Sequence, residues 1–147
     1  MYRDRNEPNG NKLRTYILYK NVLSRDFYVK NILNRQHRKN LANFRSGCLP
    51  LAIETGRYTR PKTPLEQRFC IYCKNICIED EKHFLLNCDF YSDLRFVLMK
   101  KASDINHDFI DLDLQEQFVF IMTNDQMQPV VAKTLYDMFN RRKNCII

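Results

Sequence analysis

The sequence predicts a mostly α-helical domain. Apolar residues recur three or four positions apart in several segments, as they do on one face of a helix. No alternating pattern longer than a few residues indicates a β-strand. With 147 residues, the chain is long enough for one domain, or two small ones, with a buried core. It contains no run of about 18 apolar residues, so we expect neither a transmembrane segment nor a membrane partner.

Composition divides the chain into four segments. We expect a flexible polar leader at 1–11, followed by a basic helical region that ends in a Pro- and Gly-containing loop at 12–64. A cysteine-rich region with a following helix is expected at 65–100. An acidic connector and C-terminal amphipathic helices are expected at 101–147.

The basic region is predicted to contain three helices. The first has apolar residues at helical spacing, namely Leu13, Tyr16 and Ile17. Ser24 is a favoured N-cap residue and an acid follows two positions later, so we expect it to begin the second helix. The buried stripe of this second helix is expected to consist of Val29, Ile32 and Leu33.

The third helix is predicted at 35–46 and has two different sides. Its apolar side carries His37, Leu41 and Phe44. Its basic side is a wedge of about 120° that carries Arg35, Arg38, Lys39 and Arg45. Gly47 is expected to end the helix, because glycine readily adopts the left-handed conformation that commonly follows a helix C-terminus.

Three more helices are predicted beyond the cysteine-rich region. They lie at 90–99, 114–122 and 129–142, and each has an apolar face. Residues 104–113 are rich in acids and are expected to form the connector between the first two.

The cysteine-rich region contains a complete ligand set for a tetrahedral zinc ion. Three cysteines and one histidine follow the spacing C-x2-C-x9-H-x4-C, at Cys70, Cys73, His83 and Cys88. Residues five apart point about 140° apart on a regular helix, so Cys88 is expected at or just beyond the end of a short helix that carries His83. The acids at 79–81 are expected in the first turn of that helix. Four protein ligands leave no position for a catalytic water, so the predicted site is structural.

Cysteine spacing alone leaves alternatives open. The six cysteines could be buried as small apolar residues or paired as disulfides, and Cys77 could replace one of the four ligands. The chain begins with charged residues and no apolar signal segment. We therefore expect an intracellular protein, nuclear or cytoplasmic and not secreted, and a reducing compartment favours metal binding over disulfides. Cys48 and Cys145 lie far from the cluster in sequence and are expected to be ordinary thiols.

Charge is unevenly distributed along the chain. Residues 1–68 carry 15 Lys/Arg against 5 Asp/Glu, a net charge of +10, and residues 69–147 carry 9 against 12, a net charge of −3. The first half is therefore expected to bind a polyanion. In its loop, Arg57 and Arg60 offer guanidinium groups to phosphates and Tyr58 offers a ring to an unstacked base. The alternative is that Arg57 pairs with Glu54 across a turn in which Gly56 has a positive φ.

Four motifs stand in order along this region: FRSG at 44–47, IETGRY at 53–58, RFCIYC at 68–73 and IEDEKHFLLNC at 78–88. Together they resemble the C-terminal CCHC zinc-knuckle region that lies downstream of the polymerase in non-LTR (LINE-type) retrotransposon reverse transcriptases and their fragments. The resemblance covers about residues 10–100. It implies a zinc-stabilised tail that binds template RNA or target DNA while another domain carries out the chemistry, and it assigns Cys70, Cys73, His83 and Cys88 as ligands.

The departures from this family bear on function. The sequence has no match to the paired aspartates of a reverse transcriptase palm or to the acids and lysine of a restriction-like endonuclease. We therefore expect a non-catalytic module that binds RNA, DNA or both, with a reverse transcriptase domain in the same chain or on another chain as the implied partner. The alternative is a zinc-stabilised interaction module, whose apolar helices beyond Cys88 dock onto a polymerase or another protein.

Overall fold

The structure is a computed structural model that describes residues 13–22 and 24–145. The predicted leader at 1–11 lies outside the described residues. The α-helices of the described chain are α1 (Tyr16–Tyr19), α2 (Phe27–Asn31), α3 (Arg35–Arg45), α4 (Ala52–Thr55), α5 (Ser92–Ile105), α6 (Leu114–Thr123) and α7 (Gln128–Asn144). In this part of the chain, β pairing is limited to an antiparallel bridge between Phe69 and Ile78. The predicted mostly α-helical fold is therefore confirmed.

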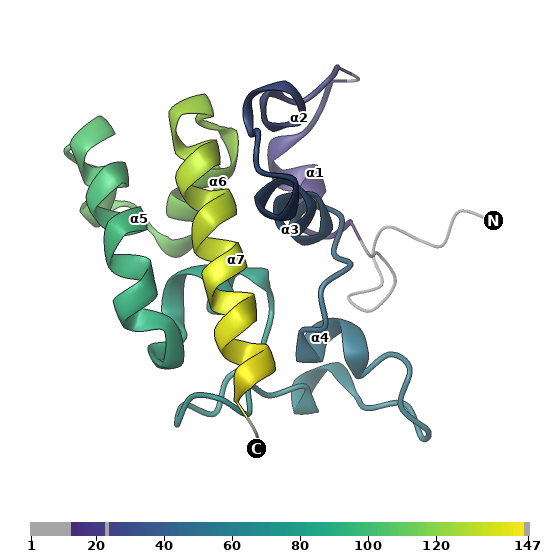
Figure 1. Ribbon diagram of the computed structural model, residues 1–147. Coiled ribbons are helices and arrows are strands. Elements are labelled where there is room, and N and C mark those ends of the chain that lie inside the picture. The colour runs from purple at the N-terminus through teal and green to yellow at the C-terminus, as the bar shows by residue number, and fades with distance from the viewer. Residues whose placement is uncertain (1–12, 23, 146–147) are drawn as a thin grey trace.

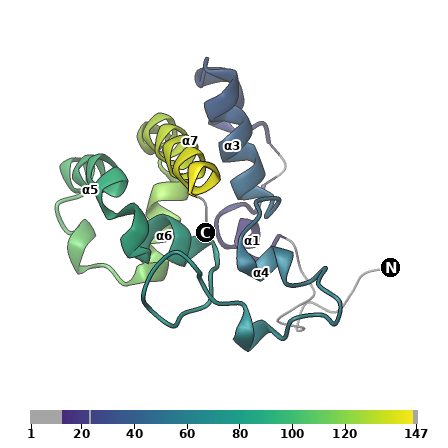
Figure 2. The same cartoon turned by 60° about the horizontal axis from the view of Figure 1, so that its bottom comes forward.

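Helix α7 is the central element of the fold. It packs against α3 on one side and α5 on the other, and its first turns also contact α2 and α6 (Figure 1). The same order of α5, α7 and α3 is visible after rotation (Figure 2). Helix α4 and the irregular chain that follows it lie at the lower end of this arrangement, near the C-terminal end of α7 (Figure 1). None of the helices in the described chain is long and apolar enough to cross a bilayer.

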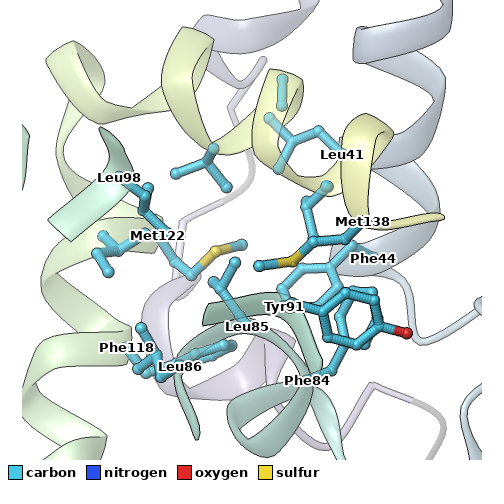
Figure 3. Packing of buried hydrophobic residues seen from close by; sticks show 14 of the residues in the cluster. Leu41, Phe44, Phe84, Leu85, Leu86, Tyr91, Leu98, Phe118, Met122 and Met138 are labelled. Atoms are coloured by element: carbon cyan, nitrogen blue, oxygen red, sulfur yellow. The ribbon is translucent and has the colours of Figure 1, made fainter. Parts of the chain in front are cut away.

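The core joins residues from the basic region, the cysteine-rich region and the C-terminal helices (Figure 3). Phe84 is completely buried at its centre. The Phe84 ring lies 4.9 Å from the rings of Tyr91 and Phe139 and 6.4 Å from the ring of Phe44, measured between centroids. Because Phe84 directly follows the candidate ligand His83, the core and the cysteine-rich region are one continuous structure.

Helix α3 agrees closely with its prediction. The Asn34 side chain accepts hydrogen bonds from the backbone of Gln36 and His37, which caps the first turn. Leu41 and Phe44 are fully buried, and the His37 ring packs 5.0 Å from the ring of Tyr136 on α7. Gly47 has a φ of 66°, and its amide donates to the Phe44 carbonyl while the Cys48 amide donates to the Asn43 carbonyl. This is the Schellman arrangement that ends helices, so the predicted stop is confirmed.

The second helix differs from its prediction. Helix α2 begins at Phe27 with Asp26 in the N-cap position, so the assignment of Ser24 was wrong. Ile32 is buried as predicted, whereas Val29 is 43% and Leu33 is 89% exposed. The helix ends at Asn31, so Ile32 and Leu33 lie in extended chain where helical spacing no longer places them on one face.

The C-terminal helices occur where the sequence predicts them. Helix α5 covers most of the segment predicted at 90–99 and continues to Ile105. Helix α6 begins with a capping box in which Asp113 and Glu116 each accept from the other's backbone amide. Helix α7 has Pro129 in its first turn, where a missing amide hydrogen costs no helical hydrogen bond.

Candidate metal centre

The first two candidate ligands lie in a short hairpin. The Cys70 amide donates to the Cys77 carbonyl, and the Glu79 amide donates to the Arg68 carbonyl, with the Phe69–Ile78 bridge between these bonds. These contacts bring the two sides of the hairpin together and leave residues 71–75 as a bend. Cys73 lies in that bend, three residues beyond Cys70, so the two thiols face the same space.

The other two candidate ligands lie at the two ends of a π-turn. The helical segment starts where the Asp80 side chain accepts a hydrogen bond from the His83 amide. It widens to a π-helix over His83–Asn87, and the Cys88 amide donates to the His83 carbonyl. This hydrogen bond spans five residues instead of four, so the wider turn returns Cys88 to the side of the helix that carries His83. The predicted position of Cys88 just beyond a short helix is confirmed.

The turns bring four side chains into one cluster. The sulfurs of Cys70, Cys73 and Cys88 and a ring nitrogen of His83 all lie within 4.8 Å of one another. The Cys70 and Cys88 sulfurs are 3.8 Å apart, and the Cys73 sulfur is 3.5 Å from His83 Nε2. Cys70, His83 and Cys88 are buried and Cys73 is half-buried. All six cysteines of the chain are free thiols. The cluster can hold a metal ion with three sulfur ligands and one nitrogen ligand.

Hydrogen bonding separates the acidities of two of the thiols. The hydrogen bond between the two sulfurs lowers the pKa of Cys70 and raises the pKa of Cys88. The thiolate is the form that binds metals. A metal ion held at the cluster would require both sulfurs as thiolates.

Cys77 occupies a different position from the four clustered residues. Its sulfur lies 3.3 Å from His83 Nδ1 and 3.7 Å from His83 Nε2. Burial raises the pKa of Cys77 to about 11. Cys77 therefore contacts the histidine of the cluster and is not among the four clustered ligand atoms. Cys48 is exposed, Cys145 is half-buried, and neither is part of the cluster.

Two arginine side chains fix the chain around the cluster, and sequence reasoning missed both. Glu79 is 1% exposed and pairs with Arg142 of α7, and its carboxylate also accepts from the Ala52 amide at the start of α4. The guanidinium of Arg142 lies 4.3 Å from the centre of the Tyr72 ring. On the other side, Arg95 of α5 donates to the carbonyl oxygens of Leu85 and Cys88.

The acids at 79–81 have three different roles. Asp80 caps the helical segment, in agreement with the prediction. Glu79 instead pairs with Arg142, and Glu81, which is 1% exposed, pairs with Arg14. Burial raises the pKa of Glu81, and the charge of Arg14 opposes this rise. Glu81 lies in the first turn, as predicted, whereas the predicted first-turn role is wrong for Glu79, which precedes the helical segment. The arginine partners of Glu79 and Glu81 lie more than 60 residues away, where local spacing carries no signal.

The residues predicted to contact nucleic acid occupy three kinds of position. Arg35, Lys39 and Arg60 are exposed, and Arg38 is half-buried and donates to the Ile32 carbonyl. Arg45 is only 5% exposed, so its predicted place on an exposed basic face is wrong. Its guanidinium donates to the Met122 carbonyl and to Asp26. The hydrogen bond to Met122 of α6 places this end of α3 in the interior.

The loop residues are arranged around Glu54. Arg57 pairs with Glu54, as in the alternative that the sequence left open, and the Tyr58 hydroxyl donates to the same carboxylate. The Tyr58 ring remains 69% exposed. Gly56 has a φ of −62°, so the expected positive φ was wrong. A Cβ at this position would lie 2.8 Å from the Arg68 side chain, so glycine is required here by close packing.

Arg68 explains this close approach. It is 3% exposed and donates to the carbonyl oxygens of Ile53 and Thr63, so it joins α4 to the far end of the loop. Its side chain passes over Gly56 to reach both oxygens. The loop at 56–63 is therefore anchored from inside, with Tyr58 and Arg60 on its exposed surface.

Comparisons with protein-family models, with curated proteins and with solved structures found no match.

Proposed function

We propose that this chain is a non-catalytic nucleic-acid-binding module stabilised by a structural zinc ion at Cys70, Cys73, His83 and Cys88. The observation that carries the zinc assignment is the spacing of the ligand atoms. Zn–S bonds of about 2.3 Å and Zn–N bonds of about 2.0–2.1 Å at tetrahedral angles place two sulfurs about 3.8 Å apart, and a sulfur and a nitrogen about 3.5 Å apart. The Cys70–Cys88 sulfur distance is 3.8 Å, the distance from the Cys73 sulfur to His83 Nε2 is 3.5 Å, and all four ligand atoms lie within 4.8 Å of one another.

The ligand set supports a structural role for this zinc. Three thiolates and one imidazole fill a tetrahedral shell and leave no position for a water that could act as a nucleophile. Zinc with three thiolates carries a net charge of about −1. Arg95, which donates to the Cys88 carbonyl, supplies positive charge beside this site, whereas the charge of Arg142 is paired with Glu79, whose carboxylate lies 3.8 Å from the Cys70 sulfur.

The nucleic-acid assignment is supported by the exposed charges of the first half of the chain. Between residues 13 and 68, excluding Leu23, the exposed cations are Arg25, Lys30, Arg35, Lys39, Arg60 and Lys62. Of the three acids in this range, Asp26 and Glu54 are engaged in ion pairs, and Glu66 is the exposed one. An exposed surface of one sign attracts a polyanion, and the exposed ring of Tyr58 offers a face for an unpaired base.

Neutralising two cations of α3 tests the electrostatic part of this proposal. We expect Arg35→Gln with Lys39→Gln to weaken binding to RNA and DNA of any sequence, because phosphate contacts carry no sequence information. Each lost contact should reduce the slope of log K against log salt by about 0.7 for single strands and 0.9 for duplex DNA. The measurement is a fluorescence anisotropy titration of the zinc-loaded chain at several salt concentrations.

Lys100→Gln with Lys143→Gln is the matched control, because both lysines are exposed and lie in the net acidic half. Replacing these two lysines should change the affinity and the salt slope much less than replacing Arg35 and Lys39. Equal losses from the two pairs, or parent binding that does not depend on salt, would contradict the assignment of the binding surface.

Cys77 provides a test of the metal shell. We expect Cys77→Ala to keep three thiolate ligands but to weaken metal affinity about 10- to 100-fold, because the group that contacts the second histidine nitrogen orients the ring. Replacing zinc with Co²⁺ makes the thiolate count visible in the charge-transfer absorption. An unchanged absorption band together with weaker metal binding supports this geometry. A band whose intensity falls by the contribution of one thiolate would identify Cys77 as a ligand.

A second candidate function is protein docking, and one surface favours it. A groove of about 510 Å³ lies between α5 and α7, lined by apolar side chains that include Leu94, Val97 and Val130. Val97 is 62% exposed, and the neighbouring Phe96 is 68% exposed. An apolar surface of this kind responds little to salt, so the salt titration above distinguishes protein docking from phosphate binding.

The resemblance to the C-terminal region of non-LTR retrotransposon reverse transcriptases agrees with both parts of the proposal. We infer that the chain derives from such a region, with RNA or DNA as ligand and a reverse transcriptase domain as partner. Testing the zinc-loaded chain against single-stranded and double-stranded RNA and DNA would identify the preferred nucleic acid.

A further inference from the structure

A fifth thiol lies beside the metal cluster, next to one of its ligands. Cys73 lies in the bend at 71–75 and Cys77 follows that bend. The Asn75 carbonyl oxygen accepts from both thiols, at 3.7 Å from the Cys73 sulfur and 3.5 Å from the Cys77 sulfur. The same two sulfurs lie 3.5 and 3.7 Å from His83 Nε2. The two thiols therefore share two neighbouring atoms and lie side by side.

The two thiols also contact each other. Burial and then a hydrogen bond with Cys73 raise the pKa of Cys77. This contact joins a residue that belongs to the four-ligand cluster to one that does not. Cys77 is therefore free to react with the Cys73 sulfur without itself leaving a ligand position.

This pair occupies the accessible side of the cluster. Cys73 is the half-buried residue of the four candidate ligands, whereas Cys70, His83 and Cys88 are only 7%, 7% and 0% exposed. Cys77 is half-buried as well. Oxidation of cysteine depends on thiolate character and on access to solvent, and it is reversible where a second thiol lies next to the first. A small oxidant dissolved in water should therefore reach Cys73 before the other two sulfur ligands.

We propose that Cys73 and Cys77 form a site of reversible oxidation, at which hydrogen peroxide converts the two thiols to a disulfide and the cluster releases its zinc. The inference rests on the proposed zinc site and assigns a reaction to the thiol beside it. The oxidant is a hydroperoxide, a small two-electron oxidant that needs no binding pocket.

The reaction proceeds in two balanced steps. The Cys73 thiolate attacks one peroxide oxygen, the O–O bond breaks and hydroxide leaves, so that the sulfur is oxidised to a sulfenic acid while the peroxide is reduced. The Cys77 sulfur then attacks the sulfenic sulfur. The S–S bond forms, the S–O bond breaks, and the hydroxyl group leaves as water with the Cys77 proton.

Disulfide formation removes one ligand from the cluster, because only the thiolate binds a metal ion. Cys70, Cys88 and His83 remain, and three ligands hold the ion less tightly than four. A dithiol reductant reverses the change by thiol–disulfide exchange and restores the full ligand set.

Peptide mapping of the zinc-loaded chain after peroxide treatment identifies the bond. Trypsin cleaves at Lys74, between the two thiols, so peptides 69–74 and 75–82 stay joined only if a disulfide links them. We expect this joined pair, with Cys73 rather than Cys70 as the linked residue in its fragment spectrum. Elemental analysis of the same samples should show that zinc is lost as the disulfide forms and returns after reduction in the presence of added zinc.

Cys77→Ser and Cys48→Ser are the matched variants. Cys48 is exposed and lies outside the cluster, so Cys48→Ser should form the same disulfide and recover its zinc as the parent does. In Cys77→Ser no neighbouring thiol traps the sulfenic acid on Cys73, which peroxide then oxidises to a sulfinic acid that a dithiol does not reduce. This variant should recover several-fold less zinc. Recovery is expressed as a fraction of each chain's own initial zinc, because Cys77 also contacts His83.

Each outcome decides the inference. A Cys73–Cys77 disulfide, with zinc recovery that depends on Cys77, supports it. A Cys70–Cys88 disulfide, the absence of any disulfide, or equal zinc recovery by Cys77→Ser would overturn the inference and leave the proposed zinc site intact. A parent chain that holds no zinc before peroxide is added would overturn both proposals.

Discussion

Cys70→Ser and Cys88→Ser are each expected to release the metal ion and to unfold the cysteine-rich region. Structural zinc contributes on the order of 10 kcal/mol of apparent binding free energy in comparable peptides. The net stability of a whole domain is only about 5–15 kcal/mol. Because Phe84, Leu85 and Leu86 lie between two of the ligands and are all buried, the loss should extend from the cluster into the core.

The measurement combines elemental analysis of the purified variants with thermal unfolding. The parent chain should carry one equivalent of zinc and lose helical signal when a chelator removes it. Cys48→Ser and Cys145→Ser are the controls and should retain the metal and the parent unfolding temperature, because both thiols lie outside the cluster. If Cys70→Ser and Cys88→Ser kept one equivalent of zinc, the assigned ligand set would be wrong.

Arg142→Met is expected to lower the free energy of unfolding by about 3–5 kcal/mol, because it leaves the Glu79 carboxylate buried without its cation. Glu79 is 1% exposed, and the Arg142 side chain is 11% exposed. The aliphatic part of Met replaces much of the packing volume of arginine. The loss should therefore report on the unpaired charge more than on a cavity.

The adjacent arginine provides the control. Arg141 pairs with Asp93, whose side chain is 65% exposed, and donates to the Phe90 carbonyl, so Arg141→Met should lower the free energy of unfolding much less than Arg142→Met. Adding Glu79→Gln to Arg142→Met should restore part of the stability, since it removes the isolated charge. Urea unfolding measures all four chains. Equal costs for the two arginine substitutions would show that the Glu79 pair does not stabilise the fold.

Local features of the fold were predictable because their signals lie within a few residues. Gly47 ends α3 through contacts to Asn43 and Phe44, all within one turn of chain. The ligand spacing likewise contains enough geometry to place Cys88 beyond a short helix. It does not reveal that this helix is a π-turn, because the choice between regular and widened turns depends on packing of Phe84 and its neighbours.

The buried charges were not predictable from the sequence, because their partners lie far away along the chain. Arg45 lies in the same predicted basic wedge of α3 as the exposed cations Arg35 and Lys39, but it is buried and donates to the carbonyl of Met122, which lies 77 residues away. Glu79 likewise follows a pattern typical of helix starts and instead pairs with a residue 63 positions away. Net charge therefore overestimates the binding surface, since part of the excess of arginine in the first half stabilises the interior.

The separation in sequence between the metal cluster and α7 has a consequence for synthesis at the ribosome. All four ligands have been made once Cys88 is added, whereas the helix that covers α3 and α5 begins only at Gln128. If the cluster binds zinc as proposed, we expect the emerging chain to capture the ion before its core is complete and α7 to add the Arg142–Glu79 ion pair afterwards. We expect nascent chains stalled beyond Cys88 to retain zinc while their α3 remains sensitive to protease, and full-length chains to protect it.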